Sequence, residues 1–370
     1  MPEKLRVGIV GFGEMGQNHA RIWSGMPDAE LVAIADSDPR LYAAAAEQYP
    51  QCAILKTAEE MFSDTHTQLD IAVIATQASL HCAHTLLAIQ RGCHVICEKP
   101  MALTLAECDE MVDAAKRMGV ALVVHHQHAF TRAAARAEEF IAEGYIGKVY
   151  AMRGVGKGRL ACYDLMEIGG HMLHLMQHFS KGEVVAVEGE ILKNDKRITE
   201  ADVVEIKTLY PEGRACGKGA GDYIWGRYSF SSGVRATLEL ATVELPVHDS
   251  RYMCLVLQGT KGQFRINFPS RSALFYRSLA LDDAEYAAQV WERLDMTTDH
   301  DPHYNYPMRQ FAEDFLRAIE LGLIPSVSGE DGRAVMEMTR GIYAAHFHRA
   351  PVYLPNDRRR YVDSLNSLFA

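Results

Sequence analysis

Residues 5–16 read LRVGIVGFGEMG, and this stretch predicts how the first part of the chain folds. The apolar run Val7–Val10 is typical of a short buried strand, and it leads into a G-x-G-x-x-G pattern formed by Gly11, Gly13 and Gly16. Amphipathic periodicity over residues 17–24 predicts a helix directly after the glycines. A strand before the pattern and a helix after it are the context that a dinucleotide-binding fingerprint needs.

Each glycine has its own task in such a fingerprint. Gly11 permits the tight turn, Gly13 lets the backbone approach a pyrophosphate, and Gly16 allows the helix to pack closely on the strand. The N-terminus of the helix offers N–H groups and a partial positive charge to the phosphates. The alternative is a glycine turn in an α/β domain that binds no nucleotide. The predicted cofactor-binding residues here are Gly11, Phe12, Gly13, Glu14, Met15 and Gly16.

An acidic residue is expected about 20 positions after the fingerprint, at the end of the second strand. Asp36 lies there, 20 positions after Gly16, and Ser37 follows it. A carboxylate binds a ribose 2′-hydroxyl and repels a 2′-phosphate. The only basic residue nearby is Arg40. The sequence therefore predicts NAD, in preference to NADP, as the cofactor.

The chain has 370 residues, which predicts two domains. In the first third, short apolar runs alternate with helical patterns, and this predicts a parallel sheet with helices on both faces. After about residue 126, long segments with period-2 character are joined by tight turns, which predicts a largely antiparallel sheet. The fold class is thus α/β, with a Rossmann dinucleotide-binding domain over residues 1–125 and an α+β substrate-binding and oligomerisation domain over residues 126–370. The glycine-rich run Gly213–Gly221 is predicted to be a flexible loop.

The composition argues against two classes of partner, nucleic acids and membranes. Lys and Arg number 38 against 48 Asp and Glu, and the formal net charge of −10 argues against a nucleic-acid or anionic-membrane surface as the main partner. No apolar run approaches the roughly 18 residues of a membrane span, and the N-terminus does not resemble a signal peptide. The 8 cysteines form no Cys-x-x-Cys pair. We expect a cytoplasmic protein with reduced thiols, no membrane partner and no nucleic-acid partner.

Polar residues follow two further strands of the predicted parallel sheet. Thr76 and His81 come after one strand, and Glu98 and Lys99 come after the next, directly before Pro100. Rossmann-type domains bind ligands beyond the carboxyl ends of their strands, so Lys99 is predicted to reach the cofactor. The alternative is a surface lysine that closes a turn.

With these residues the sequence resembles the Gfo/Idh/MocA oxidoreductases, named for glucose–fructose oxidoreductase and inositol dehydrogenase. The resemblance covers nearly the whole chain. It is carried by the fingerprint at residues 11–16, Thr76 with His81, Glu98-Lys99-Pro100, residues 143–149, residues 328–332 and residues 352–355. The resemblance implies that Thr76, His81, Glu98 and Lys99 belong to the cofactor site.

The resemblance also implies a catalytic pair. Lys99 corresponds to the lysine that contacts the reacting hydroxyl, and His171 to the general base of an Asp-x-Gly-x-His motif. Glu167 stands where the family has aspartate, which alters the geometry of any support it gives to His171. This set suits hydride removal from a secondary alcohol. A histidine accepts the hydroxyl proton near neutral pH, and a lysine ammonium stabilises the developing alkoxide.

Six of the 16 histidines lie in two segments, residues 125–128 and 171–178. The predicted substrate-binding residues are His126, His128, His174 and Arg153, with linker or surface roles as the alternative. His171, His174 and His178 share one helix face, and the i, i+4 spacing of the last two occurs in zinc helices. The pattern lacks the glutamate of a His-Glu-x-x-His motif, so the prediction is a polar substrate pocket and no metal.

The predicted function is NAD(H)-dependent transfer of hydride to or from a secondary hydroxyl or ketone of a sugar, glycoside or cyclitol. Lys99 polarises the oxygen, His171 exchanges the proton and Glu167 supports His171. One alternative is a glycosidase-type enzyme that uses tightly bound NAD for transient oxidation. Another is a non-catalytic NAD(H)-sensing protein. The expected partner is a small polyhydroxylated substrate, and the family resemblance implies a homodimer or homotetramer.

Overall fold

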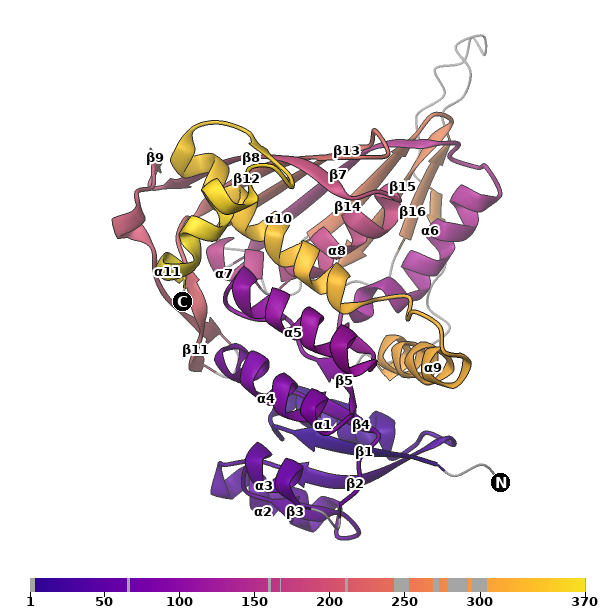
Figure 1. Cartoon of the computed structure of the whole chain (residues 1–370). Helices are drawn as coiled ribbons and strands as arrows, with labels where there is room; N and C mark the ends of the chain where they lie inside the picture. The colour runs from indigo at the N-terminus through magenta and orange to yellow at the C-terminus, as the bar shows by residue number, and fades with distance from the viewer. Residues whose placement is uncertain are drawn as a thin grey trace, which may run out of the picture. The chain divides into compact units, whose positions relative to one another are not determined.

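The computed structural model divides the chain into two compact units (Figure 1). Unit 1 holds Met1–Gln127, Ala215–Gly217 and Asp301–Met336, and unit 2 holds His128–Arg214, Lys218–His300 and Glu337–Ala370. The structure describes residues 4–64, 67–158, 161–166, 168–209, 212–242, 253–268, 273–277, 292–294 and 305–369.

Unit 1 is built on a parallel six-stranded sheet in the order β3-β2-β1-β4-β5-β6. Its strands are β1 (Leu5–Val10), β2 (Ala29–Ala35), β3 (Ala53–Leu55), β4 (Ile71–Ile74), β5 (His94–Cys97) and β6 (Leu122–Val124). Its helices are α1 (Glu14–Trp23), α2 (Pro39–Gln48), α3 (Ala58–Ser63), α4 (Ala78–Gln90), α5 (Leu105–Met118) and α9 (Asn305–Leu321). The predicted parallel Rossmann sheet is confirmed.

Local sequence signals explain where these elements begin. Apart from the edge strand β3, whose residues are half-buried, the strands are apolar runs with buried central residues, as expected for a sheet covered on both faces. Thr104 and Glu107 form a capping box at the start of α5, and Gly119, at φ +67°, ends that helix in the left-handed region. The side chains of Asp38 and Thr57 cap α2 and α3.

Helix α9 comes from the last quarter of the chain but belongs to unit 1. It packs against α1, and the Arg21 guanidinium donates to the Asn305 carboxamide at 3.3 Å. Phe311 and Phe315 lie on its buried side. The sequence reading did not anticipate this return of the chain to the N-terminal unit.

Unit 2 is built on a large mixed sheet in the order β17-β16-β15-β14-β7-β13-β12-β8-β18, with β9 paired to β8. Every recorded pairing is antiparallel except that of β7 with β13, which is parallel. The strands are β7 (Val149–Gly158), β8 (Val184–Lys193), β9 (Lys196–Arg197), β12 (Tyr223–Phe230), β13 (Arg235–Thr242), β14 (Met253–Gly259), β15 (Gly262–Phe268), β16 (Ala273–Arg277), β17 (Glu292–Leu294) and β18 (Val352–Tyr353). The prediction of a largely antiparallel second sheet is therefore confirmed.

Helices lie on one face of this sheet (Figure 1). They are α6 (Arg132–Ala142), α7 (Ala161–Met166), α8 (Ile168–Ser180) and the second half of α10 (Gly329–His348), and α11 (Asn366–Phe369) ends the described chain. Close packing of α8 on β7 depends on Gly154, because a Cβ there would collide with the sulfur of Met172. Gly226 of β12 likewise faces Ile342 of α10.

The prediction of a flexible loop over Gly213–Gly221 is wrong for residues 213–219. They lie in β11 (Glu212–Gly219), which pairs with β10 (Val204–Leu209) in a two-stranded sheet, and not in a loop. Backbone hydrogen bonds to β10 define this strand, because its glycine-rich sequence lacks the β-branched and aromatic side chains that usually indicate one. In the part of the chain that the structure describes, no helix is long and apolar enough to cross a membrane.

Candidate active site

The carboxyl ends of the unit 1 strands lie at a single edge of the sheet. Backbone bonds continue the ladder past the strands, from Ala75 N to Val10 O at 2.8 Å, from Glu98 N to Ile74 O at 2.9 Å and from His125 N to Cys97 O at 2.8 Å. The fingerprint follows β1, so it shares this edge with the residues after β4, β5 and β6. Chain order reverses beside β1, with β2 on one side and β4 on the other. Ligands of Rossmann-type sheets bind at such a switch point.

The fingerprint has the geometry of a phosphate-binding turn. Gly11 has φ +94°, and a Cβ there would lie 2.5 Å from the carbonyl oxygen of Ala75. A Cβ on Gly16 would collide with the carbonyl oxygen of Gly11. Both positions therefore need glycine.

The first turn of α1 is left open to a ligand. Gly13 is its N-cap and makes no side-chain cap hydrogen bond, whereas α2, α3 and α5 are each capped by a side chain. Unsatisfied N–H groups at a helix start are ready to bind phosphate. Glu14 is exposed and Met15 half-buried beside this turn, while the Phe12 ring is fully buried. The fingerprint residues thus fit the pyrophosphate of a dinucleotide.

Asp36 lies half-buried directly after β2. Its Oδ2 accepts the N–H of Phe12 at 2.6 Å and its Oδ1 accepts the N–H of Asp38 at 2.8 Å. Ser37 beside it is exposed. The guanidinium of Arg40 donates to the Asp38 carboxylate at 3.1 and 2.8 Å. Arg40, the basic residue that follows Asp36 in the sequence, is therefore paired with Asp38 and not with Asp36.

The loops after β4 and β5 are joined by a buried histidine. Nδ1 of His81 lies 2.8 Å from the carbonyl oxygen of Pro100, and Nε2 lies 3.0 Å from that of Thr76. Burial lowers the pKa of His81 against the raising effect of both carbonyls. The Thr76 hydroxyl lies 3.3 Å from Nδ1 of His84. His81 therefore lies between the two loops that carry Thr76 and Lys99, and as a neutral imidazole it donates to one of these two carbonyl oxygens.

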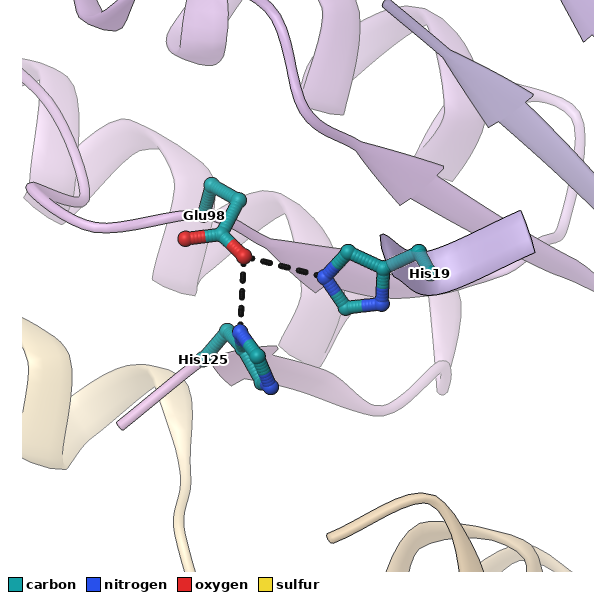
Figure 2. Close-up of side chains that lie close together, drawn as sticks. All are labelled: His19, Glu98 and His125. Carbon is teal, nitrogen blue, oxygen red and sulfur yellow. Dashed lines mark hydrogen bonds and ion pairs between the residues drawn. The ribbon is translucent and has the colours of Figure 1, made fainter. Parts of the chain in front are cut away.

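The carboxylate of Glu98 is the centre of a buried hydrogen-bonded group in unit 1. Its Oε1 accepts from Nε2 of His19 at 2.9 Å and from Nδ1 of His125 at 2.7 Å (Figure 2). Its Oε2 accepts from the backbone N–H of Lys99 at 3.2 Å. His19, Glu98 and His125 are hereafter the Glu98 triad. The side chain of Lys99 itself is half-buried.

Charge in the Glu98 triad is set by burial and by mutual attraction. Burial raises the pKa of Glu98, but the attraction and hydrogen bonds of His125 and His19 outweigh it and hold that pKa well below its usual value. Burial, followed by repulsion from His125, lowers the pKa of His19. The carboxylate is therefore ionised at neutral pH, and His19 is a neutral imidazole that donates its Nε2–H.

In unit 2, three histidines lie on α8 and His128 contacts one of them. The rings of His128 and His171 lie with their centroids 4.2 Å apart, and both side chains are buried. His174 stacks on His178 at 6.3 Å, and Nε2 of His178 lies 2.6 Å from Oε1 of Glu138. Burial, with a smaller contribution from His178, lowers the pKa of His174 to about 3. His128, His171 and His174 are hereafter the α8 histidines.

The remaining predicted residues are dispersed. Arg153 is exposed on β7 and donates to Glu239 at 3.4 Å, on the face of the sheet opposite Gly154 and α8. The structure therefore does not bring it to the α8 histidines. His126 is buried in unit 1, and its N–H donates to Val124 O at 2.7 Å. Glu167 lies outside the described residues.

Among the described residues, one group of three side chains has the spacing of metal ligands, and it is the Glu98 triad. The sequence did not point to His19, and it placed His125 in the histidine segment 125–128 that was predicted to face the substrate. A signal was present: Gly16, His19, Ala20 and Trp23 form one buried stripe of α1, so a polar side chain occupies an otherwise apolar face.

Comparison with known proteins identifies unit 1. The family model for oxidoreductases with an NAD-binding Rossmann fold, GFO_IDH_MocA, matches residues 5–126. This match confirms NAD as the predicted cofactor, and the fingerprint geometry agrees with it.

Curated relatives align with parts of the chain. D-glucoside 3-dehydrogenase of Escherichia coli K12 is 31% identical over 46% of this chain and 52% of its own length. A 2,7-anhydro-N-acetylneuraminate hydratase of the same organism is 27% identical over 71% of this chain and 68% of its own length. The chain spans about half, or less, of the first curated relatives that it matches.

The fold of the whole chain also has solved counterparts. Levoglucosan dehydrogenase, solved with NADH and levoglucosan, superposes with a TM-score of 0.77 at 21% identity, covering 95% of this chain and all of that one. Such a likeness shows the fold. The likeness to this oxidoreductase family thus holds for residues 5–126, and the likeness over the whole chain is one of fold.

Proposed function

We propose that the protein is an NAD(H)-dependent dehydrogenase that acts on a secondary hydroxyl or ketone of a sugar, glycoside or cyclitol. The observation that carries the proposal is the position of Lys99. It follows β5 at the sheet edge that also carries the fingerprint, in a domain of an NAD-binding oxidoreductase family. The names of the relatives support the substrate class, since they include dehydrogenases of D-glucoside, D-apiose and levoglucosan.

Lys99 and His171 divide the work on the reacting oxygen. His171 accepts the hydroxyl proton during oxidation and returns it during reduction. The Lys99 ammonium stabilises the alkoxide charge that develops on the same oxygen. When bound, NAD supplies the hydride acceptor. Glu167 supports His171, and His126, His128 and His174 supply polar groups to substrate hydroxyls.

A second candidate function follows from the hydratase relatives. They align over 267 and 275 residues, against 184 for D-glucoside 3-dehydrogenase. The alternative is an enzyme that oxidises its substrate transiently and returns the hydride, so that NAD is unchanged overall. The same Lys99 and His171 would serve this chemistry.

We retain the homodimer or homotetramer and the cytoplasmic location as predictions. The sheet face of unit 2 opposite its helices supports self-association, because Tyr223 and Trp225 are half-exposed there, alternating with buried Ile224 and Gly226. Large aromatic side chains at a surface are enriched in protein interfaces.

The experiment is a screen of sugars, glycosides and cyclitols for NADH formation, followed by site variants on the substrate found. Lys99→Met and His171→Ala should each lower kcat by about 100- to 10,000-fold, the usual contribution of a positioned acid–base group. Lys116→Met and His348→Ala are matched controls, because Lys116 is exposed beside Glu330 and His348 is exposed on α10. Both controls should keep full turnover.

The outcomes separate the candidate functions. Net NADH formation supports the dehydrogenase. Substrate turnover without net NADH, and with loss of activity when NAD is removed, supports transient oxidation. NADH binding without turnover of any polyol class would favour the NAD(H)-sensing alternative over both enzymes. Full turnover by Lys99→Met or His171→Ala would contradict the assigned roles.

A further inference from the structure

The Glu98 triad connects three segments of unit 1 that are far apart in the sequence. His19 lies on α1, the helix that the fingerprint opens, Glu98 follows β5 and His125 follows β6. His19 and Glu98 are 79 residues apart, and Glu98 and His125 are 27 apart. All three side chains are buried. The Glu98 carboxylate thus links the helix that follows the fingerprint to the turn that carries Lys99.

Each oxygen of Glu98 has a separate task. Oε1 accepts both imidazole N–H groups, at 2.9 and 2.7 Å, and Oε2 accepts the backbone N–H of Lys99 at 3.2 Å. Both imidazoles hold the same oxygen, and the second oxygen accepts from the backbone of Lys99. A carboxylate can accept at both oxygens at once, whereas an amide offers a single oxygen and two N–H groups.

We propose that His19, Glu98 and His125 are positioning residues, which hold the Lys99 backbone so that its ammonium meets the reacting oxygen. The inference rests on the proposed function, since it assumes the catalytic role of Lys99. The triad acts through the Lys99 amide, which donates to Glu98. An ionised carboxylate that two buried imidazoles fix in place is a rigid support for that amide.

Metal binding is the rival interpretation, because these three side chains also have ligand spacing. Positioning is favoured because His19 and His125 already direct one nitrogen each at the same carboxylate oxygen, at hydrogen-bonding distance. Nε2 of His125 is buried without a hydrogen-bond partner, and its ring meets Phe311 in a T-shaped contact with centroids 4.7 Å apart. That phenyl ring supplies no ligand to a cation.

The central variant is Glu98→Gln, which keeps the shape of the side chain. Whichever way the amide turns, either the Lys99 N–H or the two imidazoles lose an acceptor. We expect kcat on the identified substrate to fall about 10- to 100-fold, as when a reacting group is misplaced by a fraction of an ångström to 1 Å. The Kd for NADH should stay nearly unchanged, since the fingerprint backbone is untouched.

A double-variant cycle distinguishes action through Lys99 from an independent effect. In the Lys99→Met background, Glu98→Gln should cause no further loss of kcat, because the ammonium that it positions is already gone. Multiplicative losses would overturn the proposal. Full turnover by Lys99→Met alone would overturn the catalytic role of Lys99 and this inference with it.

A second readout needs neither substrate nor cofactor. In the apoprotein, the Lys99 amide of Glu98→Gln should exchange its hydrogen roughly tenfold faster than in the wild type, because it loses either its acceptor or the two imidazoles that hold that acceptor in place. Pro100 has no amide, so a peptide over residues 98–101 reports on few sites besides Lys99. Unchanged exchange would overturn the proposal even if activity falls.

Conservative replacements of the histidines provide a rescue test. The amide nitrogen of asparagine can stand where Nδ1 of His125 stands, and that of glutamine where Nε2 of His19 stands. His125→Asn and His19→Gln should keep kcat within about threefold, and His125→Leu and His19→Leu should lose about tenfold or more. If the leucine variants do not fold, the asparagine and glutamine variants and the exchange of the Lys99 amide still decide. Stoichiometric metal in the wild type that is absent from Glu98→Gln would overturn positioning in favour of a metal site.

Discussion

The two histidine groups of this protein are buried in different ways. In the Glu98 triad, each imidazole is joined to a carboxylate at 2.7 or 2.9 Å. Around α8, His128 and His171 meet ring to ring, and His174 stacks on the more exposed His178. A carboxylate fixes a neutral or charged imidazole in one orientation, while burial near another imidazole drives a ring toward the neutral form. The first arrangement suits positioning, and the second suits a group that must take up and release a proton.

The largest expected effect is on the stability of unit 1. His125→Leu leaves the buried Glu98 carboxylate with one hydrogen-bond donor fewer, and such a loss costs about 1–3 kcal/mol, and more where the group left behind is charged. Urea unfolding at pH 7 measures the loss. The exposed His348→Leu should stay within about 0.5 kcal/mol of the wild type. A loss below about 1 kcal/mol for His125→Leu would mean that the carboxylate does not depend on this imidazole, and the contrast between the two groups would disappear.

A smaller effect is expected from the α8 histidines, and it depends on pH. The pKa of His174 is about 3 in the folded protein, whereas an unfolded histidine titrates near 6.5. Below pH 6.5 the unfolded chain therefore binds a proton that the folded protein does not, so stability is complete above pH 6.5 and is lost as the pH falls toward 3. From pH 7 to pH 5 this contribution amounts to about 2 kcal/mol.

His174→Leu should remove that contribution. The free energy of unfolding of the variant should fall about 2 kcal/mol less than that of the wild type between pH 7 and pH 5. Glu98 acts in a lower window, because its folded pKa lies below the unfolded value near 4.3, and its stabilisation is lost only as the pH falls below that value. Parallel pH curves for the wild type and His174→Leu would show that His174 is protonated in the folded protein at pH 5.

Sequence patterns were sufficient for elements that local signals define. β1, β4 and β5 are apolar runs between turn residues, which is the pattern that predicts a parallel sheet, and Thr104 with Glu107 forms the capping box of α5. The fingerprint and Lys99 could be predicted for the same reason, because each belongs to a motif of consecutive residues. The strand at residues 213–219 was missed because its glycines have no β-branched pattern, and pairing with β10 determines its structure.

Contacts between residues far apart in the chain could not be predicted from the sequence. His19 and Glu98 are 79 residues apart, and nothing local to either of them indicates the partner. The return of α9 to α1 is of the same kind, because it depends on which apolar faces meet after the chain has folded. The position of Arg153 on the outer face of β7 follows from sheet register, which the sequence alone does not fix.

The smallest expected effect concerns a carboxylate of unit 1 that has backbone partners and is only half-buried. Asp36 accepts N–H groups of Phe12 and Asp38, so Asp36→Asn keeps one acceptor and loses the charge that repels a 2′-phosphate. The ratio of the Kd for NADPH to that for NADH should fall about tenfold, or 1.4 kcal/mol, in fluorescence titrations of the apoprotein. Adding Asp38→Ala should lower the ratio further, because it releases Arg40. Glu47→Gln, an exposed carboxylate on α2, should leave the ratio unchanged. An unchanged ratio in Asp36→Asn would show that cofactor choice does not depend on the charge of Asp36. Of the two carboxylates compared in unit 1, only the buried Glu98 would then have a role in function.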